Sequence, residues 1–469
     1  MRLFQNIEKF KNETALINDA GKKFTYKKIS SYSKKISKII KPRSLVLLIT
    51  ENSIGSVISY ISLIKNDCVV IIIDVKTPAN SALELFKKYK PNFILFPQNW
   101  TNLQKFNNCS FLISFLDYDI ICNNIQNKFK IHPELSMLLT TSGSMGSSKL
   151  VKLSKKNLFV NTNSIRDYLK INHKKRSVTT MPTSYSYMIS IINSYIENGA
   201  SIYVTKLSIM QKKFWDNYNL YKITSFSGVP YIFETIIKLG IKKVFIDSLE
   251  EFTQAGGKLS NIYLKKYIKL CEQFKKKFII MYGQTEASPR MSYLDWKFAK
   301  SKLGSIGKSL NKTKLWIADK KNKKIKKPGV IGELIFEGPN VALGYSNNIF
   351  DLNKGDENKG VLKTGDLASM DTNGFIYIKG RINRIAKIYG NRVSLDELEE
   401  KMQTQNLNIV CRNNKDKIEI FYEKEYDQKN LLNKLSFLSA LNKNIFEFKK
   451  VNKFPKTLSG KIDIQKLKI

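Results

Sequence analysis

Three short, unbroken apolar runs stand out in the first hundred residues. They are SLVLLIT at 44–50, CVVIIIDV at 68–75 and NFILF at 92–96. Runs of this length without alternating polar positions predict strands that are buried on both faces. Between them, the segments 32–40 and 82–89 space their apolar residues three and four apart, which predicts amphipathic helices. Alternation of such strands and helices predicts parallel sheets covered by helices.

The alternation continues with predicted strands at 200–205, 243–247 and 277–283. From about Gly304 the pattern changes to short alternating stretches punctuated by Gly, Pro and Asn, such as GELIFEGPNVALGY. Such stretches predict a small barrel or a distorted sheet.

The last part of the chain predicts a small α+β unit. SLDELEEKM predicts a helix that begins after Ser394, with Glu397 placed to complete a capping box. The predicted fold is therefore α/β. A large N-terminal domain of mostly parallel sheets and helices occupies residues 1–383 and contains a barrel-like part at about 304–383. A small mobile C-terminal lid occupies residues 384–469.

The composition is that of a globular protein, with 42% hydrophobic and 11% aromatic residues among 469. The formal net charge of +40 suggests a nucleic-acid-binding protein as one alternative. However, the lysines are scattered from end to end, and no zinc-finger spacing, RNP-type strand or basic helix with heptads is present. A general bias towards Lys, Asn and Ile is therefore favoured over a nucleic-acid surface. A basic surface would still attract nucleotides, coenzyme A or an acidic carrier protein.

Cysteine and histidine usage narrows the possible chemistry. The chain has five cysteines and two histidines: Cys68, Cys109, Cys122, Cys271, Cys411, His132 and His173. The cysteines form no CxxC pair, which favours a reducing compartment, and no signal peptide or membrane span is expected. We therefore expect a cytoplasmic protein. With so few histidines, a His-rich metal site is excluded, and catalysis that depends on a histidine base is disfavoured.

A loop rich in hydroxyl residues and glycine follows the apolar stretch LSMLL. Its sequence is TTSGSMGSSKL at 140–150. Glycines that adopt positive φ let backbone N–H groups turn towards a phosphate, and Lys149 adds a positive charge. The spacing is not that of a Walker A loop. Taken alone, the segment is equally compatible with a phosphate loop and with a linker.

Three later segments add polar groups suited to a nucleotide. MYGQTEASPRM at 281–291 places Tyr282, Thr285 and Glu286 after a predicted strand, at the edge of a parallel sheet where ligands bind. TGD places Asp366 in a tight turn, and PKTLSGK ends in Lys461. Each of these residues alone also has an ordinary structural explanation as core packing, a helix cap, a turn or a solvated surface group.

Together and in this order, the four segments resemble the signatures of the adenylate-forming superfamily of acyl-CoA synthetases, peptide-synthetase adenylation domains and luciferases. QAGGKL at 254–259 and GRINRIAKIYGNRVSLDELE at 380–399 are similar to further segments of that family. The resemblance spans residues from about 24 to 466. Within the superfamily, the wording around MPTSYSYM and SPRMSYL looks closest to AMP-dependent ligases associated with O-antigen genes.

The resemblance implies a role for each matching residue. The β- and γ-phosphates of ATP would be held by Thr141, Ser142, Gly143, Ser144, Gly146 and Lys149. Tyr282 would lie against adenine with Gly256 and Gly257, and Asp366 and Arg381 would hold the ribose. Thr285 would contact the α-phosphate, Glu286 would bind Mg²⁺, and Lys461 would bridge the α-phosphate and the attacking carboxylate. Tyr185 and Gly283 would border the acid, and Asn383 would be the hinge.

The implied reaction is ATP-dependent activation of a carboxylic acid to an acyl-adenylate, with release of pyrophosphate. Acyl transfer to the thiol of coenzyme A or of a phosphopantetheinyl carrier protein would follow. Met145 and Ser148 depart from the family pattern in the loop, and Asn383 replaces the usual hinge aspartate. The alternatives are an amino-acid-activating ligase of the D-alanine or peptide-synthetase type, a non-catalytic relative that senses nucleotide, and a nucleic-acid-binding protein.

Overall fold

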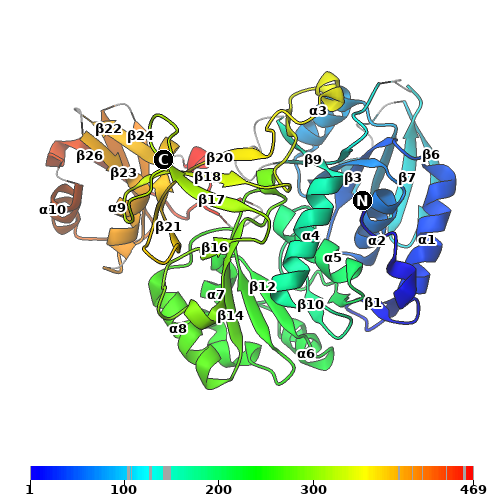
Figure 1. Ribbon diagram of the computed structural model, residues 1–469, viewed down its shortest axis with the longest axis horizontal. Helices are drawn as coiled ribbons and strands as arrows, with labels where there is room; N and C mark the ends of the chain where they lie inside the picture. Colours follow the sequence, from blue (N-terminus) through cyan, green and yellow to red (C-terminus); the bar gives the residue numbers. More distant parts are fainter. Residues whose placement is uncertain are drawn as a thin grey trace.

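The structure is a computed structural model that describes residues 2–102, 106, 108–125, 129–140, 149–388, 391–403, 405–414, 416–439, 441–457 and 461–467. Figure 1 shows three parts: a helix-covered blue-to-teal part, a green part below it, and an orange-to-red lobe at the C-terminal end. Among the described residues, no helix combines the length and the apolar character needed to cross a bilayer.

An eight-stranded sheet organises the N-terminal part. Its order is β19 (Gly344–Ser346), β9 (Leu150–Ser154), β8 (Leu135–Thr140), β4 (Val69–Asp74), β3 (Leu45–Thr50), β5 (Phe93–Pro97), β7 (Tyr118–Asn123) and β6 (Cys109–Phe115). The central strands β8, β4, β3 and β5 are parallel, and the outer strands pair antiparallel. Every residue of β3 and β4 is buried, as their apolar runs predict.

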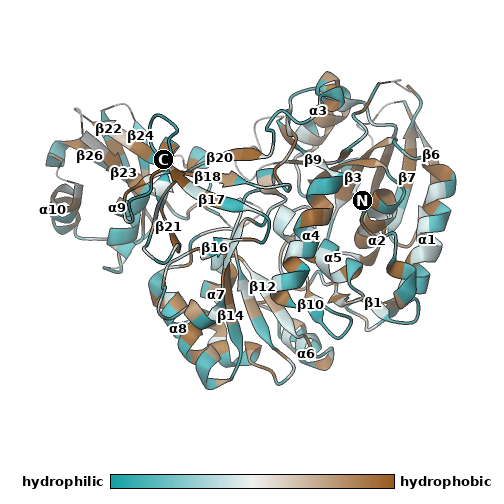
Figure 2. Ribbon diagram, in the orientation of Figure 1, coloured by the Kyte–Doolittle hydropathy of each residue, from teal (hydrophilic) through white to brown (hydrophobic). Residues whose placement is uncertain are grey.

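The two faces of this sheet pack against different helices. Val46 and Leu48 of β3 share a core cluster with α1 (Tyr26–Ile39) and α2 (Ile54–Lys65), whereas Leu45 and Leu47 cluster with α3 (Ala79–Tyr89). This division follows from the two-residue period of a strand, which turns successive side chains to opposite faces. Figure 2 shows the hydrophilic and hydrophobic stripes along outer helices such as α1 and α8 (Asn261–Gln273).

A second sheet carries much of the candidate site. Its order is β12 (Ser225–Gly228), β13 (Glu251–Gln254), β14 (Lys277–Tyr282), β15 (Ser292–Leu294) and β16 (Lys308–Ser309). The first three strands are parallel and the last two antiparallel. A third sheet has the order β10 (Arg176–Val178), β11 (Ser201–Tyr203), β1 (Thr14–Ile17) and β2 (Lys23–Thr25). The remaining helices of this part are α4 (Lys155–Leu169), α5 (Ser186–Glu197), α6 (Lys212–Leu220) and α7 (Pro230–Gly240).

The predicted strand at 243–247 is wrong. Ile241–Val244 form a 3₁₀ helix, and the strand of this region is β13, which follows it. Phe252 of β13 lies opposite Phe226 and Phe278 in the two neighbouring strands. The apolar run at 243–247 packs against this sheet instead, with Phe245 in ring contact with Phe252. A short apolar run has no period that separates a strand from a packed turn.

An antiparallel sheet and the C-terminal lobe complete the fold. The sheet has the order β17 (Lys314–Ala318), β18 (Gly332–Glu337), β20 (Val361–Met370) and β21 (Ile376–Arg381). The lobe contains β22 (Ile385–Ile388), β23 (Asn391–Ser394), α9 (Leu395–Gln403), β24 (Ile409–Asn414), β25 (Lys417–Tyr422), α10 (Gln428–Ser439) and β26 (Phe446–Lys450). The Ser394 hydroxyl accepts a hydrogen bond from the Glu397 N–H at 3.3 Å, which confirms the predicted helix cap.

Lys152 fastens the loop after β19 to the central sheet. Its side chain is fully buried, and its ammonium group lies 2.8 Å from the Glu357 carboxylate. It also donates to the carbonyls of Asp351 and Lys354 at 3.2 and 3.3 Å. A buried ammonium group retains its charge only where such partners replace water.

We predict that Glu357→Gln lowers the free energy of unfolding by about 1–3 kcal/mol, because it removes the carboxylate that pairs with the buried ammonium group of Lys152. Urea unfolding followed by circular dichroism measures the change. Glu272→Gln is the matched control, because the Glu272–Lys300 pair is exposed on both sides and should change nothing measurable. An equal, negligible effect of both substitutions would contradict the role assigned to Lys152.

Candidate active site

The Asp366 carboxylate is the centre of a polar cluster between β14 and the antiparallel sheet. Asp366 lies in β20 directly opposite Arg381 in β21, and the Arg381 Nε lies 3.0 Å from the Asp366 Oδ1. The Tyr282 hydroxyl at the end of β14 donates to Oδ2, and Gln284 Nε2 donates to the same oxygen at 3.0 Å. Both carboxylate oxygens therefore have protein partners in this structure.

This arrangement shifts the pKa of Tyr282. Burial raises it well above its ordinary value of 10, and the negative charge of Asp366 raises it further. Tyr282 is thus held as a neutral hydrogen-bond donor. The ring connects the second sheet to the antiparallel sheet, so any ligand at the end of β14 also meets Asp366.

Lys461 reaches this cluster from the C-terminal lobe. Its turn is closed by the Thr457 N–H, which donates to the Lys461 carbonyl at 2.8 Å, and by the Lys461 N–H, which donates to the Thr457 hydroxyl at 3.2 Å. Burial lowers the pKa of the Lys461 ammonium group, and the neighbouring Arg381 charge lowers it further. Asp366 and Glu286 act in the opposite direction. Lys461 is therefore a partly buried cation that is influenced by charges of both signs.

Thr285 and Glu286 lie in a short 3₁₀ turn after β14. The hydroxyls of Thr285 and Ser186 are 3.0 Å apart, and the Tyr345 hydroxyl donates to Glu286 Oε1 at 3.0 Å. The Lys149 ammonium group lies 3.6 Å from the centroid of the Tyr345 ring. These contacts connect the end of the hydroxyl-rich loop to Glu286 through one aromatic ring.

Gly256 and Tyr185 meet on the other side of the cluster. Gly256 has a φ of +82°, and a Cβ there would lie 2.7 Å from the Tyr185 hydroxyl oxygen. Gln254 Nε2 donates to the Gly257 carbonyl at 2.8 Å and fixes this turn. Next to it, Lys258 forms an ion pair of 2.7 Å with Glu400 of α9, which joins the lobe to the loop.

The sequence-predicted residues are thus partly assembled. Tyr282, Asp366, Arg381, Lys461 and Glu286 interact directly or through their charges. Asn383 lies exposed in the 3₁₀ turn Ile382–Arg384, directly after Arg381. The loop residues Thr141, Ser142, Gly143, Ser144, Met145, Gly146 and Ser148 lie outside the described residues.

Sequence reasoning missed Gln284, Tyr345 and Ser186. All three lie within or next to segments that resemble the family, but no residue pattern marks them as site residues. By contrast, Tyr187 and Met188, which follow Ser186 in α5, are buried. The Tyr187 hydroxyl donates to the Thr253 carbonyl at 2.8 Å.

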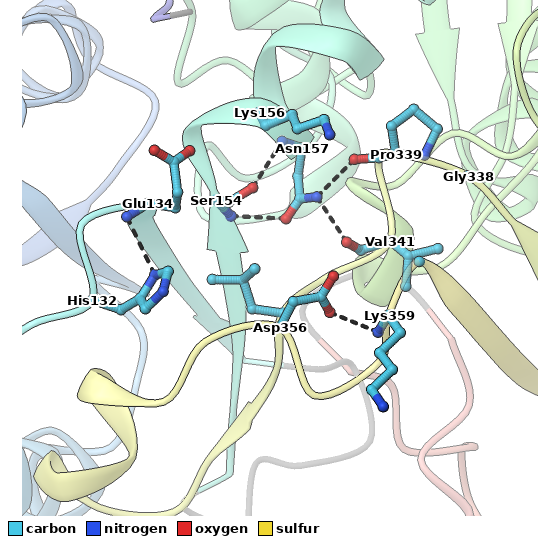
Figure 3. Close-up of a pocket in the computed structure, with 12 residues that line it drawn as sticks. His132, Glu134, Ser154, Lys156, Asn157, Gly338, Pro339, Val341, Asp356 and Lys359 are labelled. Carbon is cyan, nitrogen blue, oxygen red and sulfur yellow. Dashed lines mark hydrogen bonds between the residues drawn. The ribbon is translucent and has the colours of Figure 1, made fainter.

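A separate cavity of about 470 Å³ lies at the opposite end of the β8–β9 hairpin (Figure 3). It is lined by residues that include His132, Glu134, Asn157 and Lys359, and the Asn157 amide donates to the carbonyls of Pro339 and Val341. Because β8 is six residues long, about 20 Å separates this cavity from Thr140 at the far end of the strand. It is not part of the candidate site.

The described residues contain no group of three or more His, Cys, Asp or Glu side chains able to hold a metal ion. Glu286 is a single carboxylate whose Oε1 already accepts from Tyr345. One carboxylate is nevertheless what Mg²⁺ uses when substrate phosphates supply further ligands. The residues present therefore fit a magnesium ion that enters with a nucleotide.

Comparison with known proteins identifies the family. The AMP-binding enzyme family matches residues 3–346, and the chain belongs to this family. The oxalate–CoA ligase of Saccharomyces cerevisiae is 29% identical over 269 residues, which are 57% of this chain and 48% of that protein. Bacitracin synthase 2 of Bacillus licheniformis is 24% identical over 502 residues, which cover 99% of this chain and 18% of that protein. The matched region spans about half the length of the oxalate–CoA ligase and less than a fifth of the length of bacitracin synthase 2.

Solved structures share the fold. The o-succinylbenzoate coenzyme A synthetase of Bacillus subtilis, in complex with ATP and magnesium ion, has a TM-score of 0.78 at 18% identity, with 98% of each chain covered. ATP-bound MatB from Rhodopseudomonas palustris has a TM-score of 0.76 at 16% identity, with 97% of this chain and 94% of that chain covered. The predicted fold class is confirmed. The closer resemblance to O-antigen-associated ligases stays a prediction.

We predict that Gly283→Ala is strongly destabilising, by about 1–3 kcal/mol, because the new Cβ would lie 1.4 Å from the Pro289 carbonyl oxygen. The midpoint of urea unfolding measures the loss. Gly257→Ala is the control, since its nearest neighbour is a proline carbon at 3.2 Å. If both variants unfold at the same urea concentration, the close approach at Gly283 does not constrain the turn.

Proposed function

We propose that this chain activates a carboxylic acid with ATP and then transfers the acyl group to a thiol. A carboxylate oxygen attacks the α-phosphorus, the bond to the β-phosphate oxygen breaks, and pyrophosphate leaves. A thiolate then attacks the acyl carbon, and AMP leaves as the C–O bond breaks. The observation that carries this proposal is that Lys461 joins the Asp366–Arg381–Tyr282 cluster at the end of β14.

The proposed roles follow from the charges and donors in the cluster. Asp366 and Arg381 hold the ribose, with rearrangement of the contacts that now occupy the Asp366 carboxylate. Thr285 donates to the α-phosphate, and Lys461 neutralises the charge that develops there. The desolvation of Lys461 supports this role, because a charge acts most strongly in a site without water.

The nucleotide's remaining parts have proposed partners as well. Gly256 and Gly257 lie on the adenine side with Tyr282, and Lys149 with the loop residues 141–146 holds the β- and γ-phosphates. Glu286 is the ligand proposed for Mg²⁺, which would supply charge neutralisation at the phosphates. Tyr185 and Gly283 border the acid. The support for these roles is the resemblance of their segments to the family.

The acceptor is proposed to be coenzyme A or a phosphopantetheinyl carrier protein. Relatives named as CoA ligases and the positive net charge of +40 support a polyanionic acceptor. The match to bacitracin synthase 2 across 99% of this chain keeps an amino-acid-activating ligase as the second candidate. Formation of acyl-CoA would indicate coenzyme A as the acceptor, and a mass increase on a carrier protein would indicate the carrier protein.

We also propose that Asn383 is the hinge between an N-terminal domain, 1–383, and a mobile C-terminal lid, 384–469. The lid would present Lys461 for adenylation and then rotate for thiol transfer. The Lys258–Glu400 ion pair is a contact that such rotation would break. The five free cysteines support a reducing compartment such as the cytoplasm.

Lys461→Ala tests the proposal. We predict that acid-dependent ATP–pyrophosphate exchange falls about 10²–10³-fold, the usual effect of removing one donor that stabilises transition-state charge. ATP binding, measured by calorimetry, should change little. Exchange at the wild-type rate in Lys461→Ala contradicts the role of Lys461, and absence of exchange in the wild type over a broad acid panel contradicts the activity.

A pH profile tests the charge on Lys461. Because burial lowers its pKa below the ordinary 10.5, we predict that kcat/KM for exchange declines at a lower pH than an ordinary lysine would give. Activity is retained below the lowered pKa, where Lys461 is charged, and is lost as the pH rises through it. Lys461→Arg should move this decline to higher pH, because guanidinium stays charged. An unchanged alkaline limb in Lys461→Arg would show that another group titrates.

A further inference from the structure

Arg290 is a buried cation beside the candidate site that the proposed reaction does not use. It is 2% exposed. Its Cα lies 3.2 Å from the position of a Cβ on Gly283, and its carbonyl accepts from the amides of Asn161 and Asn340, each at 2.9 Å. The backbone at Arg290 is therefore fixed against the turn that carries Thr285.

Tyrosine rings surround the guanidinium group. Its Cζ lies 3.9 Å from the centroid of the Tyr187 ring. The positive charge of Arg290 also lowers the pKa of Tyr168, Tyr185 and Tyr187, against the larger upward effect of burial. The Tyr185 hydroxyl also lies against Gly256, in the loop assigned to the nucleotide.

No carboxylate neutralises this charge within the described ranges. Arg290 has no ion pair there, and its Nε is buried without a hydrogen-bond partner. Glu251 is a buried carboxylate whose charge reaches Tyr168, but its Oε1 lies 3.7 Å from the Lys175 ammonium group. Tyr168 makes a side-chain hydrogen bond with Arg290, but no described carboxylate does. A buried charge without an opposite charge is costly, and active sites are where such groups are retained.

Thr285, where the proposed reaction places the activated carboxylate, and Arg290 both lie against the start of α5. Ser186 is the residue between Tyr185 and Tyr187, and its hydroxyl lies 3.0 Å from that of Thr285. Thr285 and Arg290 thus contact adjacent residues at the start of α5. A ligand that places one carboxylate at Thr285 needs only a short spacer to bring a second anionic group to the guanidinium.

We propose that Arg290 binds a second carboxylate of the acid, so that the preferred substrates are short dicarboxylic acids. This inference rests on the proposed adenylation and names its substrate class. One carboxylate is activated beside Thr285, and the other pairs with the planar guanidinium fork, which matches carboxylate geometry. Arg290 Nε, which has no hydrogen-bond partner among the described residues, is a donor available to it.

The experiment compares pairs of acids that differ only in a second carboxylate: butanoate with succinate, pentanoate with glutarate, and benzoate with phthalate and isophthalate. ATP–pyrophosphate exchange gives kcat/KM for each. For at least one matched pair, the wild type should have a kcat/KM for the diacid about 10- to 100-fold that for the monoacid, the range expected for a charged hydrogen-bonded pair. Arg290→Met should bring that ratio near one, chiefly through loss of diacid activity, and Arg290→Lys should retain part of it.

Arg176→Met is the matched control, because Arg176 is another partly buried arginine, bonded to Ser201 at 2.8 Å and outside the site. It should leave the ratio unchanged even if it lowers stability. The ratio within one preparation does not depend on the folded fraction, so a purely structural role for Arg290 would not move it.

Two results would overturn the inference while leaving adenylation intact: a wild type that prefers the monoacids in every pair, or an Arg290→Met variant that keeps the diacid preference. If Arg290→Met does not fold, the wild-type ratio and Arg290→Lys decide the question. Absence of ATP–pyrophosphate exchange with every monoacid and every diacid would overturn the proposed function itself, and this inference with it.

Discussion

The Asp366 carboxylate is the group on which the site depends, because two separately formed sheets meet there. Tyr282 and Gln284 come from the end of the second sheet, and Arg381 comes from β21 and the chain leading into the lobe. The two partners of Asp366 Oδ2 and the cation at Oδ1 fix the angle between the sheets at this point. The site could not be built from any one sheet.

The position of the C-terminal lobe also affects the charges within this cluster. Partial burial of Lys461 and the charge of Arg381 lower its pKa, whereas the charges of Asp366 and Glu286 raise it. Moving the lobe would therefore change the electrostatics of the site as well as its shape. The exposed Lys258–Glu400 ion pair stabilises the contact between the lobe and the loop only weakly. A weak contact can be broken and formed again when the lobe moves.

Prediction from sequence succeeded where one local pattern had one structural outcome. The unbroken apolar runs became β3, β4 and β5, and Ser394 caps α9. It failed at 243–247, where an apolar run packs as a turn against β13, and it missed β13, whose residues Glu251–Gln254 carry no strand pattern. Most of the site residues were proposed from motifs, and their catalytic roles stay predictions.

The sequence by itself determined the buried strands of the first sheet, the cap of α9, the α/β class and the family, because period, caps and ordered motifs are local properties of the chain. Tertiary structure decided which polar groups are already paired and which are not. Asp366 is engaged on both oxygens, and Tyr187 lies in the core. Arg290, one of 79 basic residues, lies buried without a carboxylate. Burial and pairing depend on residues that lie on different strands and helices, so no local pattern carries them.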